Sequence, residues 1–88
     1  MSLIAEVVQR QTERLERCRR LNRIADRAFR IAHDIRVRVR LLPLDMSSLG
    51  AVDRYIATGE VLMERSVHHE RRARRLRTLA YDTLRGRS

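Results

Sequence analysis

The chain has 88 residues, and its 20 basic residues, all arginine, outnumber 11 acidic ones to give a formal net charge of +9. A chain of this length forms one small domain with a limited core, which leaves little room for a catalytic cleft. The excess of positive charge predicts attraction to polyanions, such as nucleic acid or an acidic protein surface. We therefore expect a single domain over residues 1–88 that is not an enzyme and takes no small-molecule substrate.

The first residues, up to Val8, are mostly apolar, but Arg10 and Glu13 follow closely. This stretch is shorter than the hydrophobic region of a signal peptide, and no run approaches the ~18 apolar residues of a membrane-spanning helix. The single cysteine, Cys18, cannot form an internal disulfide, and free cysteine is most often a small buried side chain. We therefore expect a cytoplasmic protein that does not enter a membrane, with Cys18 in its core.

Residues 3–42 have the pattern of one long amphipathic helix. Apolar side chains recur mostly three and four residues apart, which is the period of an α-helix. Ser2 can cap its first turn. Acidic residues stand four places before arginines, as with Asp26 and Arg30, and a helix brings such residues close enough to pair.

Pro43 predicts the end of this helix, because proline lacks an amide hydrogen and clashes with the preceding helical turn. Three residues that follow it can cap a second helix: Asp45, Ser47 and Ser48. We therefore expect a turn near residues 43–47 and a second helix over 47–85, with Gly86 as its C-terminal cap.

Small side chains recur every seven residues in both predicted helices. They are Cys18, Ala25 and Ala32 in the first helix, and Gly59, Ser66 and Ala73 in the second. Small residues at one heptad position let two helices approach closely. The two series mirror each other about the proline, which pairs Ala32 with Gly59, Ala25 with Ser66 and Cys18 with Ala73. The sequence therefore predicts an all-α fold, an antiparallel two-helix hairpin with coiled-coil packing.

The apolar arc of the first helix spans more than 100°, which one neighbouring helix cannot cover. Two hairpins would bury it in a four-helix bundle, so we expect a homodimer. In shape this architecture resembles the small repressor-of-primer proteins, dimeric hairpins that bind paired RNA loops with an outer helical face. The resemblance is one of shape alone and implies no shared motif.

Residues 35–41 alternate strictly between apolar side chains and arginine, which is a strand pattern. A strand there, followed by Pro43, a helix, Gly59 and another helix, resembles the ribbon-helix-helix family of DNA-binding dimers. The resemblance implies that Arg36, Arg38 and Arg40 would read the DNA major groove. A continuous helix is favoured over this alternative by the mirrored heptads.

Arginines gather on the predicted outer surface of both helices. In the mirrored register, residues 68–77 lie beside residues 14–23, which concentrates positive charge toward the open end of the hairpin. Clustered guanidinium groups suit phosphate, because each can donate to two oxygens at once. The candidate nucleic-acid-binding residues are Arg19, Arg20, Arg23, Arg27, Arg30, Arg65, Arg71, Arg72, Arg74 and Arg75.

No cofactor or metal is expected. Glu64 and His68 are spaced as metal ligands on a helix, but arginines surround them and oppose a divalent cation. The sequence favours a non-catalytic protein that binds RNA or DNA backbone as an accessory or regulatory factor. The alternative is a protein-interaction module, or a small subunit of a larger assembly, whose basic face meets an acidic partner.

Overall fold

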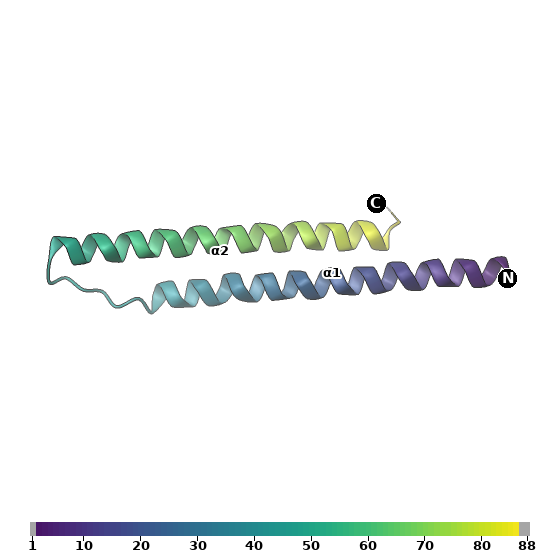
Figure 1. Ribbon diagram of the computed structural model, residues 1–88, viewed down its shortest axis with the longest axis horizontal. Coiled ribbons are helices and arrows are strands. Elements are labelled where there is room, and N and C mark those ends of the chain that lie inside the picture. The colour runs from purple at the N-terminus through teal and green to yellow at the C-terminus, as the bar shows by residue number, and fades with distance from the viewer. Residues whose placement is uncertain (1, 87–88) are drawn as a thin grey trace.

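The computed structural model describes residues 2–86, which form two long helices lying side by side (Figure 1). α1 runs over Leu3–Arg40 and α2 over Leu49–Leu84. They pack antiparallel into a rod of 75 × 17 × 13 Å, and the described residues contain no strand. The two-helix hairpin expected from the sequence is therefore confirmed, with helix ends within two residues of those predicted. Met1, Arg87 and Ser88 belong to the expected domain but lie outside the described residues.

Local capping residues define both helix starts and the end of α2. The side chain of Ser2 accepts a hydrogen bond from the amide of Ala5 at 3.1 Å, and Ser48 accepts one from the amide of Ala51 at 3.1 Å. Each bond satisfies an amide that has no partner within its helix. Gly86 follows α2 with a φ of +77°, the left-handed conformation typical of a glycine after a helix.

The connection over residues 41–48 is longer than the turn predicted near residues 43–47. Pro43 disfavours helical geometry in the residue before it, and the chain then runs beside the first turns of α2, where Leu42 and Pro43 line a shallow groove with Tyr55. Asp45 accepts a hydrogen bond from the amide of Ser47 at 2.9 Å. Hydrogen bonds from the Ser47 hydroxyl and amide lower the pKa of the Asp45 carboxyl.

The strand alternative is wrong, because residues 35–40 continue α1. Ile35 is buried against α2, and Val37 and Val39, which follow it, are half-buried. Arg36 points toward α2 and pairs with Glu70 there. The alternation of apolar side chains and arginine therefore reflects contact with α2 and not a sheet. Without a strand at residues 35–41, the resemblance to the ribbon-helix-helix family is not supported.

Small side chains form the contact between the helices, as the heptads predicted. Ala25, Ser66 and Ala73 have no exposed surface, and Ala32 retains 2%. The Ser66 hydroxyl donates a hydrogen bond to the backbone carbonyl of Ala32 at 3.0 Å, which satisfies the one polar side chain in this layer. Cys18 is buried too, as expected.

The register of the hairpin differs from the prediction by one heptad. Ser66 contacts Ala32 and not Ala25. Steps of seven residues from this contact place Ala25 opposite Ala73 and Cys18 opposite Ala80, all of them buried. The cause is the long connection: α2 begins beyond the end of α1, while the first turns of α1 extend past the end of α2 (Figure 1).

Replacing Gly59 with alanine is expected to raise the free energy of unfolding by about 0.5–1 kcal/mol, because glycine is unfavourable inside a helix by that amount. A Cβ at Gly59 would meet no atom within 4 Å. Gly86→Ala is the matched control and is expected to lower stability, because alanine is strained at a φ of +77°. Urea denaturation followed by circular dichroism measures both. A less stable Gly59→Ala protein would contradict the open space at this position.

Replacing Ala73 with leucine is expected to lower the free energy of unfolding by about 1–3 kcal/mol, because the added atoms must enter a fully packed layer. Ala57→Leu makes the same change at an exposed position of α2, where about 0.5 kcal/mol or less is expected. The same denaturation experiment compares them. Equal effects of the two substitutions would show that the alanine layer is not the close contact.

Candidate nucleic-acid interface

The observed register brings arginines from both helices to the same stretch of the hairpin. Residues 68–79 of α2 lie beside residues 19–30 of α1, and not beside residues 14–23 as the mirrored register had placed them. We call the segments 19–30 and 68–79 the arginine belt. It contains ten arginines and two acids within a length of roughly 18 Å, and so holds a formal charge of +8 of the chain's +9.

Nine of the ten predicted site residues lie in this belt, and Arg65 lies just outside it, toward the connection. The belt adds Arg77, which the charge pattern alone did not select. Arg77 contacts α1, where its guanidinium carbon lies 5.3 Å from the centre of the Phe29 ring in a cation–π arrangement. The arginine side chain thereby also covers an apolar side chain.

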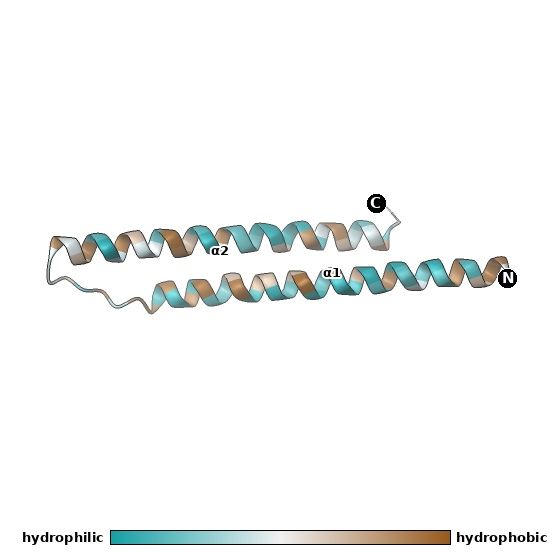
Figure 2. Ribbon diagram, in the orientation of Figure 1, coloured by the Kyte–Doolittle hydropathy of each residue, from teal (hydrophilic) through white to brown (hydrophobic). Residues whose placement is uncertain are grey.

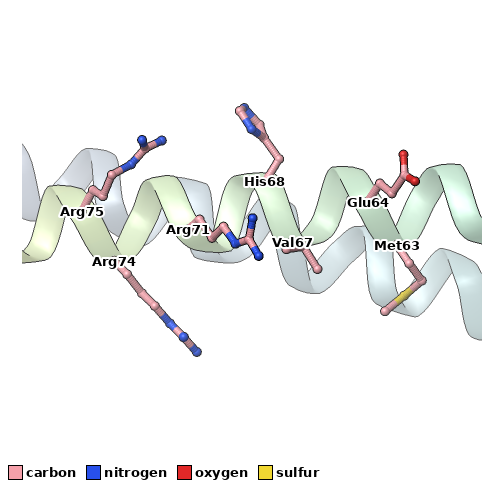
Figure 3. A pocket seen from close by; sticks show the side chains of 7 residues that line it. All are labelled: Met63, Glu64, Val67, His68, Arg71, Arg74 and Arg75. Atoms are coloured by element: carbon pink, nitrogen blue, oxygen red, sulfur yellow. The ribbon is translucent and has the colours of Figure 1, made fainter.

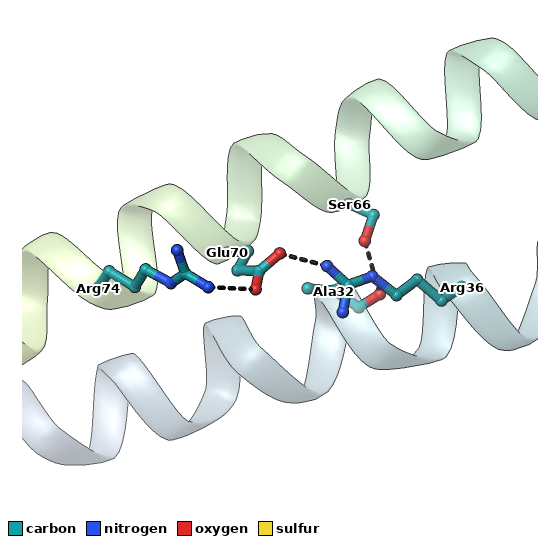
Figure 4. Close-up of polar contacts among 5 residues, drawn as sticks. All are labelled: Ala32, Arg36, Ser66, Glu70 and Arg74. Carbon is teal, nitrogen blue, oxygen red and sulfur yellow. Dashed lines mark hydrogen bonds and ion pairs between the residues drawn. The ribbon is translucent and has the colours of Figure 1, made fainter.

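Both acids of the belt are already paired. Asp26 forms an ion pair with Arg77 across the helix contact, instead of the local pair with Arg30 expected from spacing. Glu70 binds Arg36 of α1 and, at 2.9 Å, Arg74 of α2 (Figure 4). The remaining arginines of the belt therefore have no acid of the belt to neutralise them.

The belt's arginines do not form one patch, because they point in several directions around the rod. At 100° per residue, those of α1 lie mainly on its outer face, opposite the contact with α2. Arg71 and Arg75 lie on the outer face of α2, on the opposite side of the molecule. The others follow two edges: Arg74 lies on the edge that carries Phe29, with Arg19 between that edge and the outer face of α1, and Arg65 and Arg72 lie on the edge that carries Ile24.

The outer face of α1 carries the most continuous set of arginines. It consists of Arg20, Arg23, Arg27 and Arg30, which we call the arginine ridge. All four are exposed, and the acids that share their face, Glu16 and Asp34, lie beyond either end. Because planar guanidinium groups can each donate to two phosphate oxygens, the ridge presents a row of anion-binding groups on a rigid helix.

The outer face of α2 is hollowed into an open groove of mixed character. Figure 3 shows Val67 and Arg71 along its middle, with Met63 and Arg74 on one side. Glu64, His68 and Arg75 line the other side. The charge pattern had assigned Arg71, Arg74 and Arg75 to nucleic acid without the apolar and acidic side chains that share this surface.

Residues 2–86 bring together no group of three or more histidine, cysteine or acidic side chains that could hold a metal ion. His68 and His69 lie edge to face with their ring centres 5.5 Å apart, and Nδ1 of His69 is buried without a hydrogen-bond partner. Cys18 accepts a hydrogen bond from the side-chain amide of Asn22 at 3.6 Å. These groups lie apart along the hairpin, with His68 and His69 on α2 and Cys18 in the first half of α1.

Hydrophobic and hydrophilic residues follow one another in short bands along both helices (Figure 2). Within the described residues, neither helix has a stretch long and apolar enough to cross a membrane. Comparison of the chain with protein-family models, with curated proteins and with solved structures found no match. Function must therefore be inferred from the charge and geometry of the hairpin.

Replacing Glu70 with glutamine is expected to lower the free energy of unfolding by about 0.5–1 kcal/mol, because the uncharged amide loses ion pairs with two arginines that are partly exposed to solvent. Glu64→Gln, at an exposed carboxylate on the same helix, is the control and is expected to change stability little. Salt should reduce the difference between the two variants, since it screens exposed charges. An effect that persisted unchanged in high salt would contradict an ionic origin.

Proposed function

We propose that this protein is a non-catalytic helical hairpin that binds the phosphate backbone of RNA or DNA, as an accessory or regulatory factor in the cytoplasm. The supporting observation is the arginine belt, in which ten arginines face two acids and both acids are already paired. A charge of this density attracts polyanions over a range of about a Debye length, or roughly 8–10 Å at physiological salt.

The arginine ridge is the part of the belt best suited to this contact. Its four guanidinium groups extend along one exposed helical face over about 15 Å, and a rigid helix holds them in a row. Contacts with phosphate position a protein on a nucleic acid without reading its bases. Binding is therefore expected to be independent of sequence and strongly weakened by salt. With Tyr81 as the one exposed aromatic residue of residues 2–86, stacking on unpaired bases is not part of the proposal.

We also propose that two hairpins associate into a four-helix dimer. Large apolar side chains remain exposed on the helices, among them Ile24, Ile56, Val67 and Leu79. A lone pair of helices buries only the contact between them, and association with a second pair is the common way to cover the remaining apolar surface.

A second candidate function is supported by the edge of the hairpin that carries Ile24. Ile24 and Ile31 of α1 and Leu79 of α2 lie along this edge, and all three retain exposed surface. Arg65 and Arg72 border these apolar side chains from α2. An acidic amphipathic helix of a partner protein would complement this edge in both hydrophobicity and charge.

Binding to a fluorescently labelled DNA duplex and an RNA hairpin, measured by anisotropy at about 50 and 200 mM salt, tests the main proposal. The protein is expected to bind both, and four phosphate contacts should weaken binding roughly a hundredfold between the two salt concentrations. Replacing Arg23, Arg27 and Arg30 of the ridge with glutamine is expected to reduce the slope of log K against log salt by about 2–3.

The matched control replaces Arg38, Arg40 and Arg54, which lie near the connection and outside the belt, with glutamine. It makes the same change in net charge and is expected to reduce the salt slope by less than about 1. No binding to either nucleic acid at the lower salt concentration would refute the main proposal. Co-purification of a stoichiometric acidic protein without nucleic acid would favour the second candidate.

A further inference from the structure

The outer face of α2 has its charges segregated along its length. Residues along this side of α2 before Met63 include Asp53 and Glu60, whereas those after Val67 include Arg71 on the outer face and Arg74 between that face and the edge that carries Phe29. Between the two charged ends lie the apolar side chains of the groove in Figure 3, which are 40% exposed for Met63 and 37% for Val67. Along this line of side chains the order is therefore acidic, apolar and basic in the direction of the chain, with Glu64 of the groove beside the apolar centre.

These residues form one stripe along the helix. Their spacings alternate between three and four, which keeps successive side chains on one face of an α-helix. The stripe consists of Asp53, Ile56, Glu60, Met63, Val67, Arg71 and Arg74. It lies between the outer face of α2 and the edge that carries Phe29, and each of its side chains keeps exposed surface in the described part of the hairpin. Such spacing is that of a coiled-coil seam, which a second helix covers.

We infer that the outer face of α2 binds a second copy of this chain, with the two α2 helices antiparallel about a two-fold axis between Met63 and Val67. In this arrangement Met63 contacts Val67 of the second copy, and Val67 contacts its Met63. Glu60 then lies opposite Arg71 of the second copy, and the symmetry repeats this pair on the other side of the axis. A two-fold interface requires this kind of self-complementary surface.

The charges favour a second copy over other occupants. Glu60 and Arg71 are eleven residues apart, roughly 16 Å along one helix, so they cannot pair within a chain. Neither forms an ion pair within the described hairpin. A nucleic acid would be repelled by the acidic half of the stripe, and an acidic protein helix would be attracted by its basic half alone. A second copy of the stripe, running in the opposite direction, places its basic half against the acidic half and its acidic half against the basic half.

This inference rests on the four-helix dimer proposed above and specifies its interface, which covers Ile56 and Val67 and leaves Ile24 and Leu79 exposed on the other edge. It assigns Arg71 and Arg74 to contacts between subunits and leaves the arginine ridge on α1 facing solvent. Nucleic-acid binding by the ridge and dimerisation by α2 are therefore separable. Failure of either one does not alter the expectation for the other.

Charge reversal tests the pairing, with the dissociation constant of the dimer measured by sedimentation equilibrium. Glu60→Arg and Arg71→Glu are each expected to weaken the dimer about tenfold or more, because each turns two symmetric attractions into repulsions. An equimolar mixture of the two variants is expected to dimerise within about threefold of the unaltered protein. In the mixed dimer both positions are basic in one chain and acidic in the other, so each pair across the axis is again attractive. Two weak dimers whose mixture remains equally weak would overturn the inference.

Two matched valine substitutions locate the interface. Val67→Glu places a charge in the centre of the stripe and is expected to raise the dissociation constant of the dimer about a hundredfold or more. Val61→Glu lies on the edge that carries Ile24, where Val61 is 48% exposed, and should change the dissociation constant less than about threefold. Circular dichroism checks that both variants remain helical. A monomeric unaltered protein would refute the proposed dimer itself. A dimer lost in Val61→Glu but kept in Val67→Glu would instead overturn this interface alone.

Discussion

Close contact between two helices through small side chains is the constraint on which the rest of this structure depends. Ala25, Ser66 and Ala73 leave no exposed surface between the helices. A larger side chain at these positions would move the helices apart and uncover the residues beside them. The contact also fixes the register, which in turn places the arginines of α2 beside those of α1. The position of the arginine belt is thus a consequence of alanine packing as much as of charge.

The sequence predicted each helix because the signals for them are local. Ser2, Pro43 and Gly86 act on the residues beside them, so helix ends could be placed within two residues. The register could not be predicted in the same way, since a pattern that repeats every seven residues fits itself again after a shift of seven. In the mirrored register Ala80 would face Gln11. The structure places it opposite Cys18, where it is 1% exposed, because the connection continues past the end of α1 before it turns into α2 (Figure 1).

The arginines of the candidate site were visible in the composition, but their environment was not. Local spacing suggested that Asp26 pairs with Arg30, yet Asp26 pairs with Arg77, which is 51 positions away. Such a contact depends on the register and on the rotation of each helix, neither of which a charge pattern contains. The same applies to the outer face of α2, where arginines predicted to bind nucleic acid share a groove with Met63 and Glu64. Charge alone suggested one function for residues that geometry divides between several surfaces.

Concentrating positive charge on a thin rod links the stability of this fold to its partners. Guanidinium groups within the belt repel one another, and two-helix packing buries too little apolar surface to make that repulsion negligible. The long arginine side chains offset part of it by covering apolar neighbours, as Arg77 covers Phe29. On the proposals made above, a bound polyanion would relieve the repulsion further, and a second subunit would add apolar burial. A ligand that binds the folded hairpin in preference to the unfolded chain raises the free energy of unfolding with the logarithm of its concentration over its dissociation constant.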